Sequence, residues 1–170
     1  MALGYAARYA TTAAKLARYL ARKLRERGWD GDEPPDVPAL AARLAGHGYV
    51  DDRVYAQTKA RGMAARGLGA RRVRGALSAA GVCAEDQDAA LAPEDADTDP
   101  ATAALATAIA FARRRRLGPF AREPAPDPAR RQKDMAAMLR AGHGMDTARQ
   151  VLRATDAAAL EALIESAAPQ

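Results

Sequence analysis

Residues 44–82 read LAGHGYVDDRVYAQTKARGMAARGLGARRVRGALSAAGV, and this stretch decides the fold. Its apolar residues recur at helical spacing, and glycines interrupt the pattern. The pattern predicts a helix over about 51–66 that an aspartate pair opens, and a second helix that Gly81 ends. Between them lies the tripeptide Gly67-Leu68-Gly69, which we interpret as a flexible helix junction. The stretch therefore predicts short helices joined by glycine breaks.

The same signals recur along the whole chain. Periodic apolar residues between caps and glycine stops predict nine helices, over about 12–27, 36–46, 51–66, 69–80, 84–92, 99–117, 129–141, 146–154 and 156–167. The N-caps that we expect outside the opening stretch are Thr12, Asp36, Asp99, Asp146 and Asp156. A large apolar residue followed four positions later by glycine recurs at Leu24/Gly28, Leu44/Gly48, Leu77/Gly81 and Met138/Gly142, which ordinary helix C-caps explain.

The nine helices group most simply into three triads. A first three-helix repeat with an N-terminal extension covers residues 1–67, a second covers 68–118 and a third covers 129–170. The proline-rich residues 119–128 read as a linker. The predicted fold class is all-α, with three tandem three-helix, helix-turn-helix-like repeats.

Composition agrees with small stacked helical units. The chain has 170 residues, 46 of them alanine, and only 5% are aromatic. Alanine is the strongest helix former but contributes little apolar area to a core. Residues typical of strands are scarce, since the sequence has six Val and two Ile. Repeats that each bury a few large side chains suit this composition better than one large core.

Charge is segregated along the chain. Seven bases and one acid lie in residues 1–29, and seven bases and no acid lie in residues 53–83. Residues 30–52 hold six acids against one base, and residues 84–100 hold seven acids and no base. Arginine makes up 22 of the 26 bases, and its guanidinium pairs in bidentate fashion with phosphates and carboxylates. The basic blocks therefore favour a macromolecular partner.

The sequence contains few residues that could form a catalytic or metal site. The sequence has two Ser, one Cys, two His and no Asn, so neither a nucleophile triad nor a zinc cage can be assembled. His47 and His143 each lie in a Gly-His-Gly tripeptide, but two ligands are too few for a metal. Cys83 is expected to be a small buried apolar residue. The Gly67-Leu68-Gly69 run lacks the spacing and the preceding strand of a phosphate loop. We therefore expect no enzyme activity and no cofactor.

The opening stretch resembles the central repeat of the RecX family, regulators of the RecA recombinase. The resemblance rests on GYVDD at 48–52, RGLGARRV at 66–73 and GV at 81–82. Upstream, ATTAAKLARYLARKLRERG is similar to the first helix of that family. Residues 132–152 are similar to its last repeat, although Ala141-Gly142-His143 replaces the usual Arg-Gly-Phe. The resemblance covers about residues 6–152.

The resemblance implies an elongated, modular protein that lodges in the groove of the RecA filament on DNA. We also expect a cytoplasmic monomer. It would limit filament growth, ATP turnover and strand exchange in DNA repair and recombination, although some relatives assist RecA. As a hypothesis, the binding residues are exposed bases on polar helix faces: Arg18, Arg22, Arg25, Arg61, Arg66, Arg71, Arg72, Arg74, Arg113 and Arg114. The run at 113–116 is open to two interpretations, a partner-facing helix end or a solvated charge run.

Two other classes stay open. A basic helical module could bind DNA directly, weakly and without RecA, through helix-turn-helix-like pairs. A small helical enzyme is the other class, which the shortage of nucleophiles argues against. No apolar stretch is long enough to span a membrane, and the first residues lack the apolar core of a signal peptide, so we expect no membrane partner.

Overall fold

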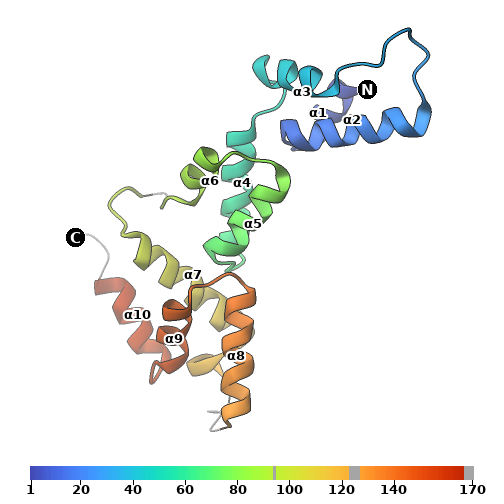
Figure 1. Cartoon of the computed structure of the whole chain (residues 1–170). Helices are drawn as coiled ribbons and strands as arrows, with labels where there is room; N and C mark the ends of the chain where they lie inside the picture. The colour runs from blue at the N-terminus through green and yellow to red at the C-terminus, as the bar shows by residue number, and fades with distance from the viewer. Residues whose placement is uncertain (94, 123–126, 167–170) are drawn as a thin grey trace. The chain divides into compact units, whose positions relative to one another are not determined.

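The structure is a computed structural model, and it describes residues 1–93, 95–122 and 127–166. Within these residues the protein contains ten α-helices and one 3-10 turn, and no strand (Figure 1). The elements are α1 (Ala2–Ala6), α2 (Ala13–Arg27), α3 (Val37–Gly46), α4 (Asp52–Ala64), α5 (Ala70–Ala80), α6 (Ala84–Leu91), α7 (Pro100–Arg115), η1 (Gly118–Phe120), α8 (Pro128–Arg140), α9 (Met145–Arg153) and α10 (Ala157–Ser166). The predicted all-α fold is confirmed.

All nine predicted helices are present as α2 to α10, with ends within two residues of those expected. Helix α1 was not predicted. It has only five residues, too few for a helix that is stable by itself in water. The ring of Tyr5 in α1 stacks on that of Tyr19 in α2, with 4.0 Å between centroids. A tertiary contact therefore holds this helix, and the local sequence pattern does not reveal it.

Side-chain caps begin most of the predicted helices. Thr12, Asp36, Asp99 and Asp156 each accept a hydrogen bond from a backbone N–H three residues later. The cap predicted at Asp146 is wrong. Gly144 is the N-cap of α9, and Asp146 lies in its first turn, where it pairs with Arg149 at 2.9 Å. An acid in the first turn is stabilised by the positive end of the helix dipole, as an acid at the N-cap is. Both positions therefore give an aspartate near the start of a helix in the sequence.

The recurrent glycines end helices as expected. Gly28, Gly48, Gly81 and Gly142 all have positive φ, the conformation that glycine adopts at little cost. After three of them, the next residue donates its N–H to the large apolar residue five positions back, which is the 6→1 bond of a helix C-cap. Met63 and Gly67 are a further, unpredicted example, in which Leu68 N donates to Met63 O at 3.1 Å.

The chain divides into two compact units. The N-terminal unit consists of Met1–Lys59 and Ala76–Ala90, and the C-terminal unit consists of Ala60–Gly75 and Leu91–Gln170. Helices α4 and α5 therefore each contribute residues to both units. These units are a different division from the three predicted repeats, whose boundaries stay predictions.

The N-terminal unit is built on α2 and α3, which pack against each other (Figure 1). Leu16 and Leu20 of α2 and Val37 and Leu44 of α3 form its core, together with Val50. Polar contacts attach α2 to the rest of the unit. The side chain of Thr12 is fully buried and donates to the carbonyl oxygen of Ala80 at 2.5 Å. The N–H of Ala13 donates to Asp52 at 2.8 Å, so α2 begins at a fixed place.

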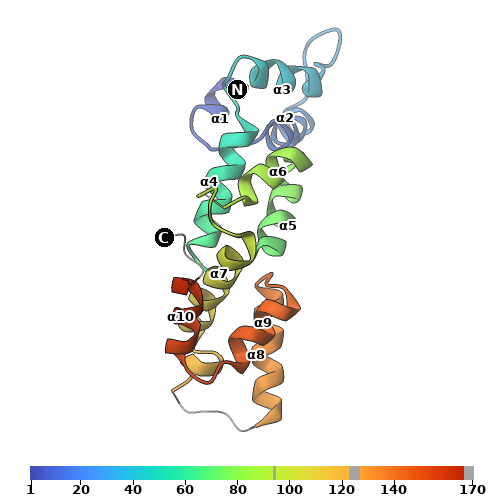
Figure 2. The same ribbon diagram turned by 90° about the vertical axis from the view of Figure 1, so that its left-hand side faces the viewer.

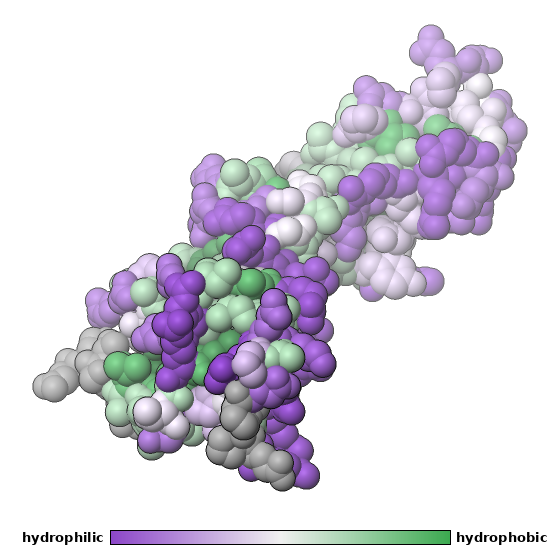
Figure 3. Space-filling model, turned by 60° about the horizontal axis from the view of Figure 1, so that its bottom comes forward, coloured by the Kyte–Doolittle hydropathy of each residue, from purple (hydrophilic) through white to green (hydrophobic). Residues whose placement is uncertain are grey.

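The C-terminal unit is built around α7. Helix α9 lies against both α7 and α8, and α10 also packs on α7 (Figure 1, Figure 2). Leu105, Ile109, Met138, Val151 and Leu160 are among its buried apolar residues. On the near part of the molecule in Figure 3, where this unit comes forward, apolar side chains lie between hydrophilic ones. A core of a few large side chains therefore stabilises each unit, as the composition suggested.

The predicted linker at 119–128 is only partly within the described residues, because 123–126 lie outside them. At its start, η1 holds Phe120 against the core of the C-terminal unit. At its end, Asp127 caps α8 by accepting from the N–H of Ala129 at 2.9 Å. No helix in the described part of the chain is long and apolar enough to cross a bilayer.

Candidate binding surface

The ten arginines predicted to bind a partner are all exposed. Three lie on α2 in the N-terminal unit. The other seven belong to the C-terminal unit, five of them on α4, on α5 or in the turn between, and two at the end of α7. A binding residue must be exposed. Its guanidinium can bind a partner more readily when it makes no hydrogen bond or ion pair within the protein.

The three arginines nearest the junction of α4 and α5 are the freest. Arg66 lies just after α4, and Arg71 and Arg72 lie in the first turn of α5. Across the residues that the structure describes, their side chains make no hydrogen bond or ion pair. Arg61 and Arg74 are also exposed, and each makes an interaction within the protein. Three guanidinium groups with unused donors therefore flank one three-residue turn.

The arginines of α2 differ from one another. Arg18 donates from Nη2 to the carbonyl oxygen of Ala79 at 2.9 Å, and this bond ties α2 to the end of α5. Arg22 pairs with Glu26 at 3.7 Å, both on the exposed face of the helix. An exposed pair of this kind contributes little to stability. Arg25 is exposed near the end of the helix. Only Arg18 has an evident structural use.

Arg113 and Arg114 tie elements of the C-terminal unit together. Arg113 forms an ion pair with Glu161 of α10 and lies over the ring of Phe120, with 5.4 Å from its guanidinium carbon to the ring centroid. Arg114 donates from Nη2 to the carbonyl oxygen of Ala65 at 3.2 Å, just beyond α4. The run at 113–116 is exposed throughout, and its first two members already have partners.

The junction of α4 and α5, residues 67–69, packs closely against the corner between α8 and α9, residues 141–144. The N–H of Gly69 donates to the carbonyl oxygen of Ala141 at 2.9 Å, and the N–H of Arg71 donates to that of Gly142 at 3.3 Å. Backbone groups far apart in sequence are thus paired. The interpretation of residues 67–69 as a flexible junction was wrong, because these long-range bonds hold the turn in place.

Glycine is required on both sides of this contact. A Cβ on Gly69 would lie 2.5 Å from the carbonyl carbon and oxygen of Gly142. A Cβ on Gly142, whose φ is +94°, would lie 2.4 Å from the backbone nitrogen of Arg72. Both distances are far inside van der Waals contact. The backbones approach so closely only because neither residue has a side chain, and Arg71 and Arg72 therefore project from a rigid base.

The side chain of His143 adds a further contact between the corner and the turn. It is 3% exposed, and its Nε2 lies 3.0 Å from the carbonyl oxygen of Gly67. Because a carbonyl only accepts, Nε2 carries the proton. Its ring also lies 5.4 Å from that of Phe111 in α7. Burial lowers the pKa of His143 below 6.5, and the hydrogen bond to Gly67 offsets part of this effect. The altered Gly-His corner noticed in the sequence is therefore a packed contact.

Ser78 and Cys83 each contact a side chain of α6. The hydroxyl of Ser78 donates to Gln87 Oε1 at 3.2 Å. Cys83 was expected to be buried, but it is exposed and its thiol contacts Asp86 Oδ2 at 3.3 Å. The helix that starts at residue 84 places it at the surface. Across the described residues, no group of three or more His, Cys, Asp or Glu side chains is placed to hold a metal ion.

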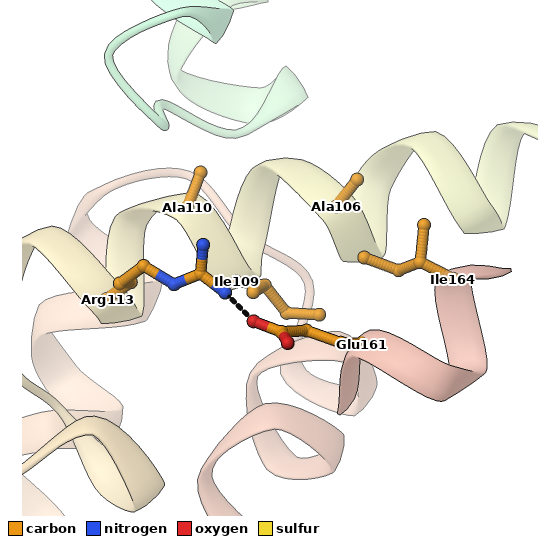
Figure 4. Close-up of a pocket in the computed structure, with 6 residues that line it drawn as sticks. All are labelled: Ala106, Ile109, Ala110, Arg113, Glu161 and Ile164. Carbon is orange, nitrogen blue, oxygen red and sulfur yellow. Dashed lines mark hydrogen bonds and ion pairs between the residues drawn. The ribbon is translucent and has the colours of Figure 1, made fainter. Parts of the chain in front are cut away.

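One cavity of about 320 Å³ lies between α7 and α10 (Figure 4). Ile109 and Ile164 give it apolar walls, and the ion pair between Arg113 and Glu161 crosses it (Figure 4). Its lining contains no Ser, Cys or His. The one carboxylate in the lining, that of Glu161, is paired with Arg113.

Two comparisons with known proteins bear on this surface. A family model described as "RecX, second three-helix domain" matches residues 51–91, which contain α4, α5 and α6. This match groups the helices differently from the predicted second repeat at 68–118. The regulatory protein RecX of Myxococcus xanthus (strain DK1622) is 35% identical over 156 residues, which cover 89% of this chain and 81% of the relative. The matched domain includes Arg66, Arg71 and Arg72.

Proposed function

Because this chain belongs to the RecX family, we propose that it binds the RecA filament on DNA and modulates, in the inhibitory direction, its recombinase and ATPase activities. The family makes the chain a regulatory protein. What we propose beyond this is that the RecA filament is the partner and that the effect is inhibition. The proposal predicts a stoichiometric binding role without catalysis.

The observation that carries the proposal is the group Arg66, Arg71 and Arg72. All three are exposed, and within the described residues their side chains have no partner. They flank a turn that backbone bonds hold to residues 141 and 142 and that the ring of His143 also contacts. Since the base is rigid, fewer degrees of freedom are lost on binding. A nucleoprotein filament presents both carboxylates and phosphates, and the guanidinium fork binds either one.

The experiment is RecA ATPase on single-stranded DNA, with and without this protein. We expect the wild type to lower the rate. A variant with Arg66→Ala, Arg71→Ala and Arg72→Ala should need at least about tenfold more protein for the same effect, because a charged hydrogen bond contributes about 1.5–3 kcal/mol.

The matched control changes three other exposed arginines, Arg43→Ala, Arg131→Ala and Arg153→Ala, and so removes the same net charge. It should act like the wild type. If both variants lose the effect equally, total charge and not this surface is responsible. If the wild type does not alter ATPase or bind the filament, the proposal fails as a whole.

A second candidate, direct binding to DNA, is favoured by the basic blocks at 1–29 and 53–83. Titration of DNA alone and of the RecA filament, each at two salt concentrations, separates the two functions. Pure phosphate binding weakens steeply as salt rises, because counterions are released from the DNA. Affinity that needs RecA and falls only weakly with salt supports filament binding.

A further inference from the structure

Three of the five tyrosines gather into one stack on the N-terminal unit. The rings of Tyr5 and Tyr19 lie 4.0 Å apart between centroids and are inclined by only 18°. Tyr9 lies 5.1 Å from Tyr5 between ring centroids, with the planes inclined by 42°. Tyr5 belongs to α1 and Tyr9 lies three residues after its end, so the unpredicted helix carries the chain that brings Tyr5 to Tyr19 of α2. Sequence spacing alone does not suggest the stack.

The two ends of the stack have different surroundings. Tyr5 and Tyr19 are partly buried and pack against the core formed by Leu16 and Leu20. Tyr9 is 58% exposed and lies outside that cluster. The core therefore accounts for the inner two rings but not for the outer one. An aromatic ring that ends a stack at the surface offers a flat apolar face to a further ring.

The segment that carries the stack is rich in basic residues. Residues 1–29 hold seven bases and one acid. Arg8 precedes Tyr9 and is exposed, and the guanidinium carbon of Arg22 lies 5.7 Å from the centroid of Tyr19. The one acid, Glu26, already pairs with Lys23 at 2.6 Å, and its pair with Arg22 at 3.7 Å is exposed and weak. The side chain of Asp52 is held by the N–H of Ala13. A ligand with flat rings and negative charge suits this surface.

We propose that the stack of Tyr19, Tyr5 and Tyr9 binds single-stranded DNA, with a base stacked on Tyr9 and backbone phosphates paired with Arg8 and Arg22. Surfaces that hold single strands without sequence preference combine these two elements, basic groups for the backbone and aromatic rings for the bases. The inference rests on the proposed function only for the choice of DNA as the polymer. It adds a contact to bases that the arginines of the C-terminal unit do not provide.

The test measures fluorescence anisotropy of two labelled oligomers of equal length without RecA. One is oligothymidylate, and the other is an abasic deoxyribose-phosphate chain that keeps the phosphates and lacks the bases. The full chain is compared with Tyr9→Ser and with Tyr9→Trp, which restores an aromatic face. The matched control is Tyr49→Ser, because Tyr49 is also 58% exposed in the same unit but contacts His47 and not the stack.

We expect Tyr9→Ser to weaken binding of oligothymidylate by about fivefold or more, which corresponds to the lower end of base stacking on an aromatic ring. Binding of the abasic chain should not change, Tyr9→Trp should bind like the wild type, and Tyr49→Ser should have no effect. Arg8→Ser should weaken binding of both oligomers.

The inference is overturned if Tyr9→Ser leaves the affinity for oligothymidylate unchanged, or lowers affinity for both oligomers equally. A melting temperature measured on each variant shows whether it is folded. If Tyr9→Ser melts early, Tyr9→Leu replaces it, since leucine keeps apolar contact with Tyr5 but has no aromatic face. Because RecA is absent throughout, the result is independent of whether the filament proposal holds.

Discussion

The Nε2 atom of His143 lies 3.0 Å from the carbonyl oxygen of Gly67, 76 positions earlier in the chain. This bond, with those from Gly69 and Arg71 to residues 141 and 142, fixes the turn between α4 and α5. The same turn is flanked by the three arginines on which the proposed function depends. Stability of the C-terminal unit and placement of the binding surface are therefore linked.

Acid should weaken the protein through His143. Burial lowers its pKa in the folded state below 6.5, so on the acid side of pH 6.5 the unfolded chain takes up a proton that the folded protein does not. The stability that His143 contributes is therefore full above pH 6.5 and falls as pH drops through the window below it.

The measurement is Tm against pH for the wild type and for His143→Phe. Phenylalanine cannot titrate and cannot bond Gly67, so this variant should be less stable at neutral pH but should lose less Tm on acidification. Equal slopes for the two proteins across this window would show that other groups cause the acid sensitivity.

Adding one methyl group at the contact should destabilise the protein. In Gly69→Ala the new Cβ would lie 2.5 Å from backbone atoms of Gly142, and the backbones must separate. Overpacking of this kind costs about 1–3 kcal/mol of unfolding free energy. Chemical denaturation measures the difference.

The matched control is Gly75→Ala in the middle of α5, where a Cβ meets nothing within 4 Å. It should instead stabilise by about 0.5–1 kcal/mol, because alanine favours helix over glycine. A destabilised Gly75→Ala would mean that α5 tolerates no change and that the comparison does not isolate the contact.

Thr12 should be important for the N-terminal unit. Its hydroxyl caps α2 by accepting from Lys15 and also donates to the carbonyl oxygen of Ala80. Thr12→Val keeps the shape but removes both bonds and leaves a buried carbonyl unpaired, so we expect a loss of about 1–3 kcal/mol in urea unfolding. Thr58→Val, at an exposed site within α4, should cost far less. Similar losses in the two variants would contradict this role.

Removing the arginines of α5 should not harm the fold. Arg71 and Arg72 lie in the first turn of the helix, which contains no acid. A positive charge there opposes the helix dipole, so Arg71→Ala with Arg72→Ala should stabilise the protein by up to about 1 kcal/mol each at low salt. Adding Arg74→Ala should weaken filament binding further. A clear fall in Tm together with unchanged binding would show that these side chains are structural.

Local sequence determined the helices and most of their ends. Capping bonds join residues three to five positions apart, so Thr12, Asp36 and the glycines after Leu44 and Leu77 could be recognised directly from the sequence. Alanine content and the lack of strand residues were enough for the fold class. The resemblance of residues 44–82 to a known family also needed no structure.

Which side chains are free depends on tertiary contacts. Residues 67–69 are held by bonds to residues 141 and 142 and by the ring of His143, which local sequence does not indicate. Arg113 and Arg71 are both exposed arginines, but only Arg113 has Glu161 beside it. The stack that includes Tyr9 depends on α1, a five-residue helix that is too short to be stable by itself. Each of these features joins distant segments. Their pairing follows from how whole helices pack, and no signal within one turn of the chain encodes it.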